Sequence, residues 1–185
     1  LGAVALGLAL AVRPGDPLFY AATLGVAALW TVGAFASGPL HLGRGRGRSG
    51  GPTRGVLQGL ILGLMLLAIF LAGAFVVAQI PFLRAPVEGL LNHARYGSLW
   101  VVAIITAING MAEELFFRGA VYASLDRRVN GLGSAVLYAS STLFSGVPLL
   151  TFATLCLGFL TTAQRRVTGG VLGPIASHLT WSLGM

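Results

Sequence analysis

Charged residues are scarce in this sequence, and lysine is absent. Of its 185 residues, 9% are charged and 56% are hydrophobic, and all twelve cations are arginine against five acids. A soluble domain carries about 25% charged residues, so this composition excludes a water-soluble fold. We therefore predict an all-α integral membrane protein. The length suits a polytopic transmembrane helical bundle of about seven spans, because each span needs about 20 residues.

The sequence has too few suitable residues for an internal disulfide or for a typical metal site. The single cysteine, Cys156, lies in an apolar run and has no partner for an internal disulfide. A catalytic zinc site usually has three protein ligands. The candidates inside apolar segments are Glu113, Glu114 and His178, and Glu114 is expected to pair with an arginine. We expect neither a metal nor another cofactor.

The excess of arginine does not predict a nucleic-acid partner. The net charge is +7, but a protein that reads nucleic acid needs soluble basic faces with polar or aromatic partners. This chain has no room for such faces. The arginines are instead expected in loops, where they orient the protein in the lipid bilayer. Arginine without lysine, with much glycine and alanine, favours a GC-rich bacterial source and therefore a bacterial plasma membrane.

Apolar runs and their breakers predict where the spans lie. The predicted helices cover residues 1–12, 18–38, 56–80, 98–124, 132–147, 149–164 and 171–185. The segment 81–97 is predicted to be a mixed loop or a short interfacial helix. A break at Pro148 separates the fifth helix from the sixth.

The charges of the loops predict the orientation of this bundle. Loops 39–55, 126–131 and 165–170 fall on one side. They hold eight arginines, namely Arg44, Arg46, Arg48, Arg54, Arg127, Arg128, Arg165 and Arg166, against Arg13, Arg84 and Arg95 on the other side. By the positive-inside rule, the side with more arginine is cytoplasmic.

The predicted bundle has two parts that form one integral membrane domain. Residues 1–97 supply N-terminal transmembrane helices and the basic cytoplasmic loop, and residues 98–185 contain every acidic residue, arginine and histidine placed inside a span. The chain starts at Leu1 without methionine and stops within an apolar run. We therefore expect it to be a fragment or a trimmed form.

Three ionisable residues lie together in the fourth predicted helix. Charges in hydrocarbon are costly unless they pair or face water, so such a cluster is a candidate functional site. Glu114 and Arg118 are four residues apart with the acid first, which is the favourable order for an ion pair. Glu113 is rotated by about 100° and has no cation within reach on its own helix. Either Glu113 is a general base acting on water, or all three residues only hold the bundle together.

His178 is the only histidine inside a predicted span. Counted from the cytoplasmic loops, it lies at a depth similar to that of Glu113, so the two side chains can face each other across the bundle. Ser182 lies one turn further along the same face and can orient a ligand. A lone histidine in a span is also typical of a hydrogen-bonded core residue, and this alternative stays open.

These residues resemble the CPBP family of CAAX prenyl endopeptidases and bacteriocin-processing or bacteriocin-immunity membrane proteins, also called Abi proteins. The motif Glu113-Glu114-x-x-x-Arg118 and a histidine in the final span, His178, carry the resemblance over residues 98–185. The resemblance implies that Glu113 activates water without a metal. It also implies that Glu114 and Arg118 complete the first motif and that His178 is the histidine of the last one.

Two positions depart from the family pattern. The second motif is Phe-x-x-x-His, and here Phe144 is followed by Pro148 at the histidine position. The last motif ends in asparagine or aspartate, where this chain has Ser182. Losing one donor that stabilises an oxyanion costs about 10²–10³ in rate.

Three functions are compatible with these residues. The first is an intramembrane endopeptidase that cleaves a peptide or membrane-protein substrate, with Glu113 as the base and His178 as the transition-state donor. The second is a catalytically impaired relative that acts as a binding, immunity or scaffold membrane protein, as Pro148 and Ser182 suggest. The third is a small transporter or channel whose polar path is lined by the charged residues. The oligomeric state is left open.

Overall fold

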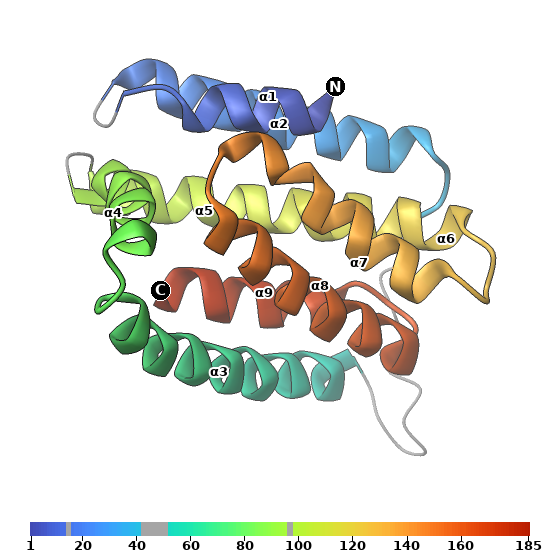
Figure 1. The fold of residues 1–185 in the computed structure, drawn as a ribbon. Coiled ribbons are helices and arrows are strands. Elements are labelled where there is room, and N and C mark those ends of the chain that lie inside the picture. The colour runs from blue at the N-terminus through green and yellow to red at the C-terminus, as the bar shows by residue number, and fades with distance from the viewer. Residues whose placement is uncertain (14–15, 42–51, 96–97) are drawn as a thin grey trace.

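The structure is a computed structural model that describes residues 1–13, 16–41, 52–95 and 98–185 (Figure 1). All regular secondary structure in these residues is helical. In chain order the helices are α1 (Gly2–Leu10), α2 (Pro17–Ala36), α3 (Pro52–Val77), α4 (Pro81–Arg95), α5 (Leu99–Glu114), the π-helix η1 (Leu115–Val121), α6 (Tyr122–Ser124), α7 (Asn130–Ser141), the 3₁₀ turn η2 (Leu143–Ser145), α8 (Pro148–Thr168) and α9 (Leu172–Gly184).

Three helical segments are long and apolar enough to cross a membrane. They are Pro17–Ala36, Gly55–Val77 and the continuous stretch Leu99–Ser124, which joins α5, η1 and α6. The all-α membrane class is therefore confirmed. The count of about seven spans stays a prediction, because the other described helices do not meet this criterion.

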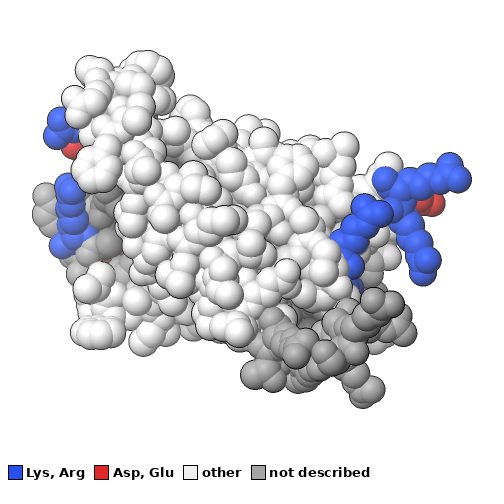
Figure 2. Space-filling view, turned by 90° about the horizontal axis from the view of Figure 1, so that it is seen from below, with Lys and Arg blue, Asp and Glu red and all other residues white. Residues whose placement is uncertain are grey.

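The surface of α3 shows why these segments suit lipid rather than water. Large apolar side chains along this helix are exposed: Leu57, Leu60, Ile61, Leu64, Met65, Ile69, Leu71, Phe75 and Val76. A continuous apolar surface of this kind is rare on a soluble monomer. Figure 2 shows the charged residues at the two ends of the molecule, with an uncharged belt between them.

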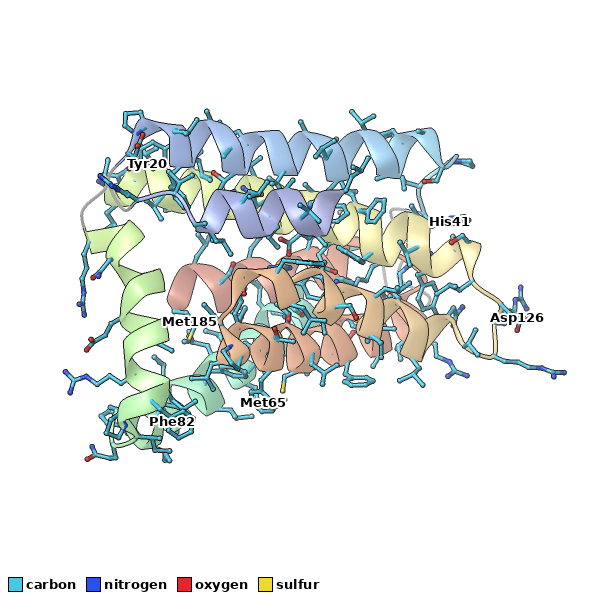
Figure 3. The ribbon with its side chains drawn as sticks, turned by 45° about the horizontal axis from the view of Figure 1, so that its top comes forward. Tyr20, His41, Met65, Phe82, Asp126 and Met185 are labelled. Carbon is cyan, nitrogen blue, oxygen red and sulfur yellow. The ribbon has the colours of Figure 1, made fainter. Side chains whose placement is uncertain are left out.

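Described residues of two loops predicted to be cytoplasmic lie at one end of the bundle. Figure 3 places His41 and Asp126 at this end, whereas Tyr20, Phe82 and Met185 lie towards the other. The backbone N–H of Val171 donates to the carbonyl of His41 at 3.2 Å, which ties two of these connections together. Three loop arginines counted in the charge argument, Arg44, Arg46 and Arg48, lie outside the described residues.

Two predicted boundaries near the site are wrong. The fifth helix, expected over 132–147, ends at Ser141 in the structure. The hydroxyls of Thr142 and Ser145 bond to nearby backbone carbonyls at 2.8 and 2.6 Å, and such local bonds compete with the helical ladder. Gly146 then adopts a left-handed conformation with φ 69°, and Pro148 starts α8 at a first-turn position that proline tolerates.

The predicted loop 165–170 is also largely helical. Arg165 and Arg166 lie in the last turn of α8, which ends at Thr168 and is followed by Gly169 with φ 72°. Basic side chains are favourable in a last turn because they face the negative end of the helix dipole. A glycine in the left-handed conformation is the usual end of a helix.

The segment 81–97, for which a loop or an interfacial helix was expected, forms α4 over most of its length. This helix lies across one end of the bundle (Figure 1). Its Arg84 donates to Glu88 at 2.7 Å in an exposed pair. Both side chains are exposed, and the hydrogen bond to the Glu88 carboxylate raises the pKa of Arg84 above its ordinary value.

The helix that carries the acidic pair lies in the middle of the bundle. α5 packs against α2 on one side and against α9 on the other, and α9 packs on α3 (Figure 1). The contact between α3 and α9 depends on glycine. A Cβ added to Gly59 would lie 2.5 Å from the carbonyl of Gly173, and one added to Gly63 would lie 2.6 Å from the carbonyl of Ser177. Small residues let helices approach this closely in a membrane.

Candidate active site

Four of the residues predicted from the sequence converge at the junction of α5 and η1. Glu113 and Glu114 end α5, Arg118 lies in η1, and His178 reaches them from α9. Glu114 is at the centre: its Oε1 lies 3.1 Å from Nη1 of Arg118 and 2.8 Å from Nδ1 of His178. The side chains of Glu114 and Arg118 are fully buried. The expected ion pair between them is present.

Glu113 has a different environment from its neighbour. Its Oε2 accepts a hydrogen bond from the Tyr138 hydroxyl at 2.7 Å and lies 3.9 Å from Nε2 of His178. Its side chain keeps 15% exposure, whereas that of Glu114 has 0%. The sequence predicts no cation within reach of Glu113 on its own helix, and no ion pair joins Glu113 to Arg118 among the described residues. They also show a partner that the sequence did not suggest, Tyr138.

The two nitrogens of His178 have separate functions. Glu114, paired with Arg118, is an acceptor, so Nδ1 of the imidazole carries a proton and donates to it. Nε2 then faces Glu113, as a lone pair in the neutral ring or as a second N–H in the protonated ring. Gly110 makes room for this ring, because a Cβ there would lie 3.3 Å from Cδ2 of His178, which is tighter than an ordinary contact.

The charges of this cluster balance only when one more proton is bound. Two carboxylates and one arginine leave a net negative charge in a buried place, and buried charges are stable only when they are compensated. One proton shared between Glu113 and His178 makes the cluster neutral. With the proton on His178, the site holds an ionised carboxylate beside an N–H donor.

The π-helix after the acidic pair is anchored by two neighbouring helices. π-Helical turns are rare and occur often at functional sites. In η1 the carbonyl of Phe117 accepts from the Ser134 hydroxyl of α7 at 2.7 Å, and that of Arg118 accepts from Nε of Arg165 in α8 at 2.9 Å. Arg165 was expected in a cytoplasmic loop, with an orienting role. It is instead buried against η1, and its guanidinium lies 5.1 Å from the centroid of the Tyr122 ring.

A second polar cluster holds α9 in place next to His178. The Ser177 hydroxyl donates to the carbonyl of Gly59 in α3 at 3.0 Å and lies 2.7 Å from the side-chain amide of Gln164 in α8. With its NH₂ group turned towards Ser177, the amide also donates to the carbonyl of Gly173 at 3.1 Å. All of these groups are buried. This cluster fixes the helix position one residue before the imidazole.

The remaining predicted positions are less closely engaged. Ser182 lies one turn beyond His178 in α9, and its hydroxyl oxygen is buried without a hydrogen bond to any residue in the described part of the chain. Phe144 and Pro148 are both exposed, at η2 and in the first turn of α8. The one hydrogen bond that Glu113 accepts from described residues therefore comes from Tyr138 and not from the position where the family has histidine.

Sequence reasoning missed Tyr138, Arg165 and the cluster of Ser177 and Gln164. Each acts through a contact between helices, and no local spacing signals such contacts. A tyrosine within an apolar run was the available clue, because a buried hydroxyl needs a partner. Among the residues that the structure describes, no group of three histidine, cysteine or acidic side chains is placed to hold a metal ion.

Comparison with known proteins identifies the half of the chain that contains this site. Residues 95–184 match the family model described as type II CAAX prenyl endopeptidase Rce1-like. Searches of curated proteins and of solved structures gave no match. The matched segment runs from the end of α4 through α9 and includes Glu113, Glu114, Arg118 and His178. The resemblance drawn from the motifs over 98–185 is confirmed: residues 95–184 match the Rce1-like family of the CPBP group.

Proposed function

We propose that the protein is an intramembrane endopeptidase that hydrolyses peptide bonds with a water molecule activated by Glu113. One observation carries this proposal. Glu113 is a partly accessible carboxyl with one oxygen held by Tyr138, and it lies 3.9 Å from Nε2 of His178. The adjacent Glu114 is fully buried between Arg118 and the same imidazole. Glu113 is thus available as a base and His178 as a hydrogen-bond donor. Glu114 and Arg118 stabilise their charges.

In the proposed reaction Glu113 takes a proton from water while the water oxygen attacks the scissile carbonyl. The carbonyl oxygen becomes an oxyanion and accepts a hydrogen bond from Nε2–H of His178. Collapse of the tetrahedral intermediate breaks the C–N bond, and Glu113 gives its proton to the leaving amine. Glu114 accepts from Nδ1–H throughout and compensates the charge of the imidazolium.

The setting of this reaction is part of the proposal. We place the site in one integral membrane domain of about seven spans, with residues 1–97 as supporting helices and 98–185 as the core. The arginine-rich end faces the cytoplasm, and the composition favours a bacterial plasma membrane. The substrate is a peptide or a membrane protein that enters from the bilayer or the cytoplasm. The reaction needs no metal.

The test is cleavage of quenched fluorescent peptides by the purified protein in nanodiscs. One peptide ends in a farnesylated CAAX sequence and its counterpart has the same sequence without the lipid. We expect Glu113→Gln to lower kcat by about 10³-fold or more, because the base is lost. Glu88→Gln, in the exposed pair of α4, is the matched control and keeps the wild-type rate. Equal cleavage by wild type and Glu113→Gln would remove Glu113 from the chemistry.

A second candidate function follows from the exposed position of Pro148. A chain that lacks the second-motif histidine and carries Ser182 in the last motif can bind peptides without cleaving them, as an immunity or scaffold protein. This function predicts peptide binding that is the same in wild type and Glu113→Gln, and no product from either. Pro148→His is the direct probe, because it restores the family residue. An increase in cleavage on this change would favour the impaired-enzyme interpretation.

A further inference from the structure

Tyr138 of α7 contacts both parts of the charged cluster. Its hydroxyl donates to Oε2 of Glu113 at 2.7 Å. Its ring lies under the guanidinium of Arg118, with 4.3 Å between Cζ and the ring centroid. Neither the sequence motifs nor the family match assigns this tyrosine a function. It is the only residue of α7 for which the structure gives a contact with an ionisable side chain of the site.

The hydrogen bond from the Tyr138 hydroxyl makes the two oxygens of Glu113 inequivalent. Oε2 is occupied, and Oε1 accepts no hydrogen bond from the described part of the chain. The side chain retains 15% exposure, and Oε1 is not among its buried unpartnered atoms. A carboxyl held by one oxygen cannot rotate freely. The free oxygen therefore keeps a fixed direction for the water molecule that it is to deprotonate.

The ring that carries this hydroxyl is itself held firmly. Tyr138 is 2% exposed. Its ring centroid is 5.0 Å from that of Phe117 and 6.3 Å from that of His178. Arg118 is paired with Glu114, and the face of the Tyr138 ring is a second partner of this cation. Groups fixed in this way need no reorganisation when the reaction occurs.

We propose that Tyr138 is a positioning residue that orients Glu113 for attack by water. The inference rests on the proposed function, since it assigns a role in the same hydrolysis. Packing alone does not account for the hydroxyl, because a phenylalanine would fill the same space and would also face Arg118. The hydroxyl adds one feature, a donor to the carboxyl that the mechanism uses.

The first test removes this single oxygen atom. Tyr138→Phe keeps the ring and is expected to lower kcat by about 10- to 100-fold, the range for a lost hydrogen bond to a charged group. KM should stay within about twofold, because ground-state binding does not use the hydroxyl. The matched control is Tyr122→Phe, which removes a hydroxyl from a ring beside Arg165 and should leave both constants unchanged. The pH profile of kcat should move in the first variant and not in the second.

The second test does not need activity. The infrared band of the Glu113 carboxyl is assigned by its loss in Glu113→Gln. Tyr138→Phe should shift this band, and Tyr122→Phe should leave it in place. Both tyrosine variants should keep the wild-type Tm. A shifted band with a lower kcat supports the proposal.

The outcomes separate this inference from the proposed function. If wild type cleaves and Glu113→Gln does not, hydrolysis by Glu113 stands. If Tyr138→Phe then cleaves like wild type with an unshifted band, the positioning role is overturned. A lower kcat with a lower Tm and an unshifted band also overturns it, because only packing was lost. Equal cleavage by wild type and Glu113→Gln overturns both proposals.

Discussion

Two of the three helical segments that are apolar enough to cross a membrane, α3 and the α5–η1 segment, differ in what they contact. Both are long enough to span a membrane. In the most apolar window of α3 only 6% of the residues are buried within the protein, against 22% in the segment Leu99–Ser124. α3 has no described ionisable group in its apolar stretch, whereas the second segment carries Glu113, Glu114 and Arg118. One helix therefore separates lipid from the core, and the other brings charge into it. Charge is tolerated in the membrane only where neighbouring helices compensate it.

The largest loss of stability is expected from breaking the buried ion pair in the α5–η1 segment. Arg118→Leu leaves Glu114 as an uncompensated buried carboxylate, and breaking such a pair costs about 3–5 kcal/mol. Thermal unfolding in detergent should show a clear fall in Tm. Arg127→Leu, at an exposed position, serves as the control.

A double variant sharpens the interpretation of this loss. Glu114→Gln combined with Arg118→Leu should cost less than the sum of the two single changes, because no unpaired charge remains. Additive costs would contradict direct coupling between the two side chains.

The next largest effect concerns the lipid-facing helix itself. Gly63→Leu in α3 places side-chain atoms where a Cβ already lies 2.6 Å from the carbonyl of Ser177. Overpacking typically costs about 1–3 kcal/mol, and contact with backbone places this change at the upper end. Gly73→Leu, where nothing lies within 4 Å, should leave Tm unchanged. Equal effects of the two changes would mean that α3 does not depend on close contact with α9.

A smaller loss of stability is expected at the end of α8, where Arg165 is buried and the adjacent Arg166 is exposed. Arg165→Met removes a buried hydrogen bond of 2.9 Å to the carbonyl of Arg118, at a cost of about 1.5 kcal/mol. It should also lower kcat, because η1 loses an anchor. Arg166→Met alters an exposed side chain and should be neutral in both measurements. If Arg166→Met lowers Tm or kcat more than Arg165→Met does, Arg165 does not anchor η1.

The smallest effect is predicted for the apolar surface of α3. Leu64 is 56% exposed, so Leu64→Ala in nanodiscs should change the free energy of unfolding by no more than about 0.5 kcal/mol. A large cost would indicate that this face packs against protein rather than lipid, for example against a second copy. The measurement is denaturation followed by intrinsic tryptophan fluorescence.

Local patterns were enough to predict part of the site. The pair of Glu114 and Arg118 follows from spacing on one helix, and the approach of His178 to Glu113 follows from their similar depth. The family of residues 95–184 follows from the same motifs. The roles of these residues in catalysis remain predictions.

Other features depend on contacts that no short segment contains. The hydrogen bond from Tyr138 to Glu113 joins residues 25 positions apart, and that from Arg165 to Arg118 joins residues 47 apart. The early end of the fifth helix depends on hydroxyl groups that bond to their own backbone. Arg165 was misplaced because arginine before a glycine pair is also typical of a loop. Only packing distinguishes an anchor from an orienting charge.

The π-helix imposes a constraint on chain length. A π-helical turn contains one residue more than an α-helical turn, and in η1 two carbonyls of this segment accept hydrogen bonds from neighbouring helices. Removing one residue between Leu115 and Val121 would let the segment return to the α-helical ladder while both flanking helices keep their phase. The hydroxyl of Ser134 and the guanidinium of Arg165 would then lose their acceptors. Deletion scanning should therefore find this short segment intolerant of the loss of a single residue, whichever of its side chains is removed.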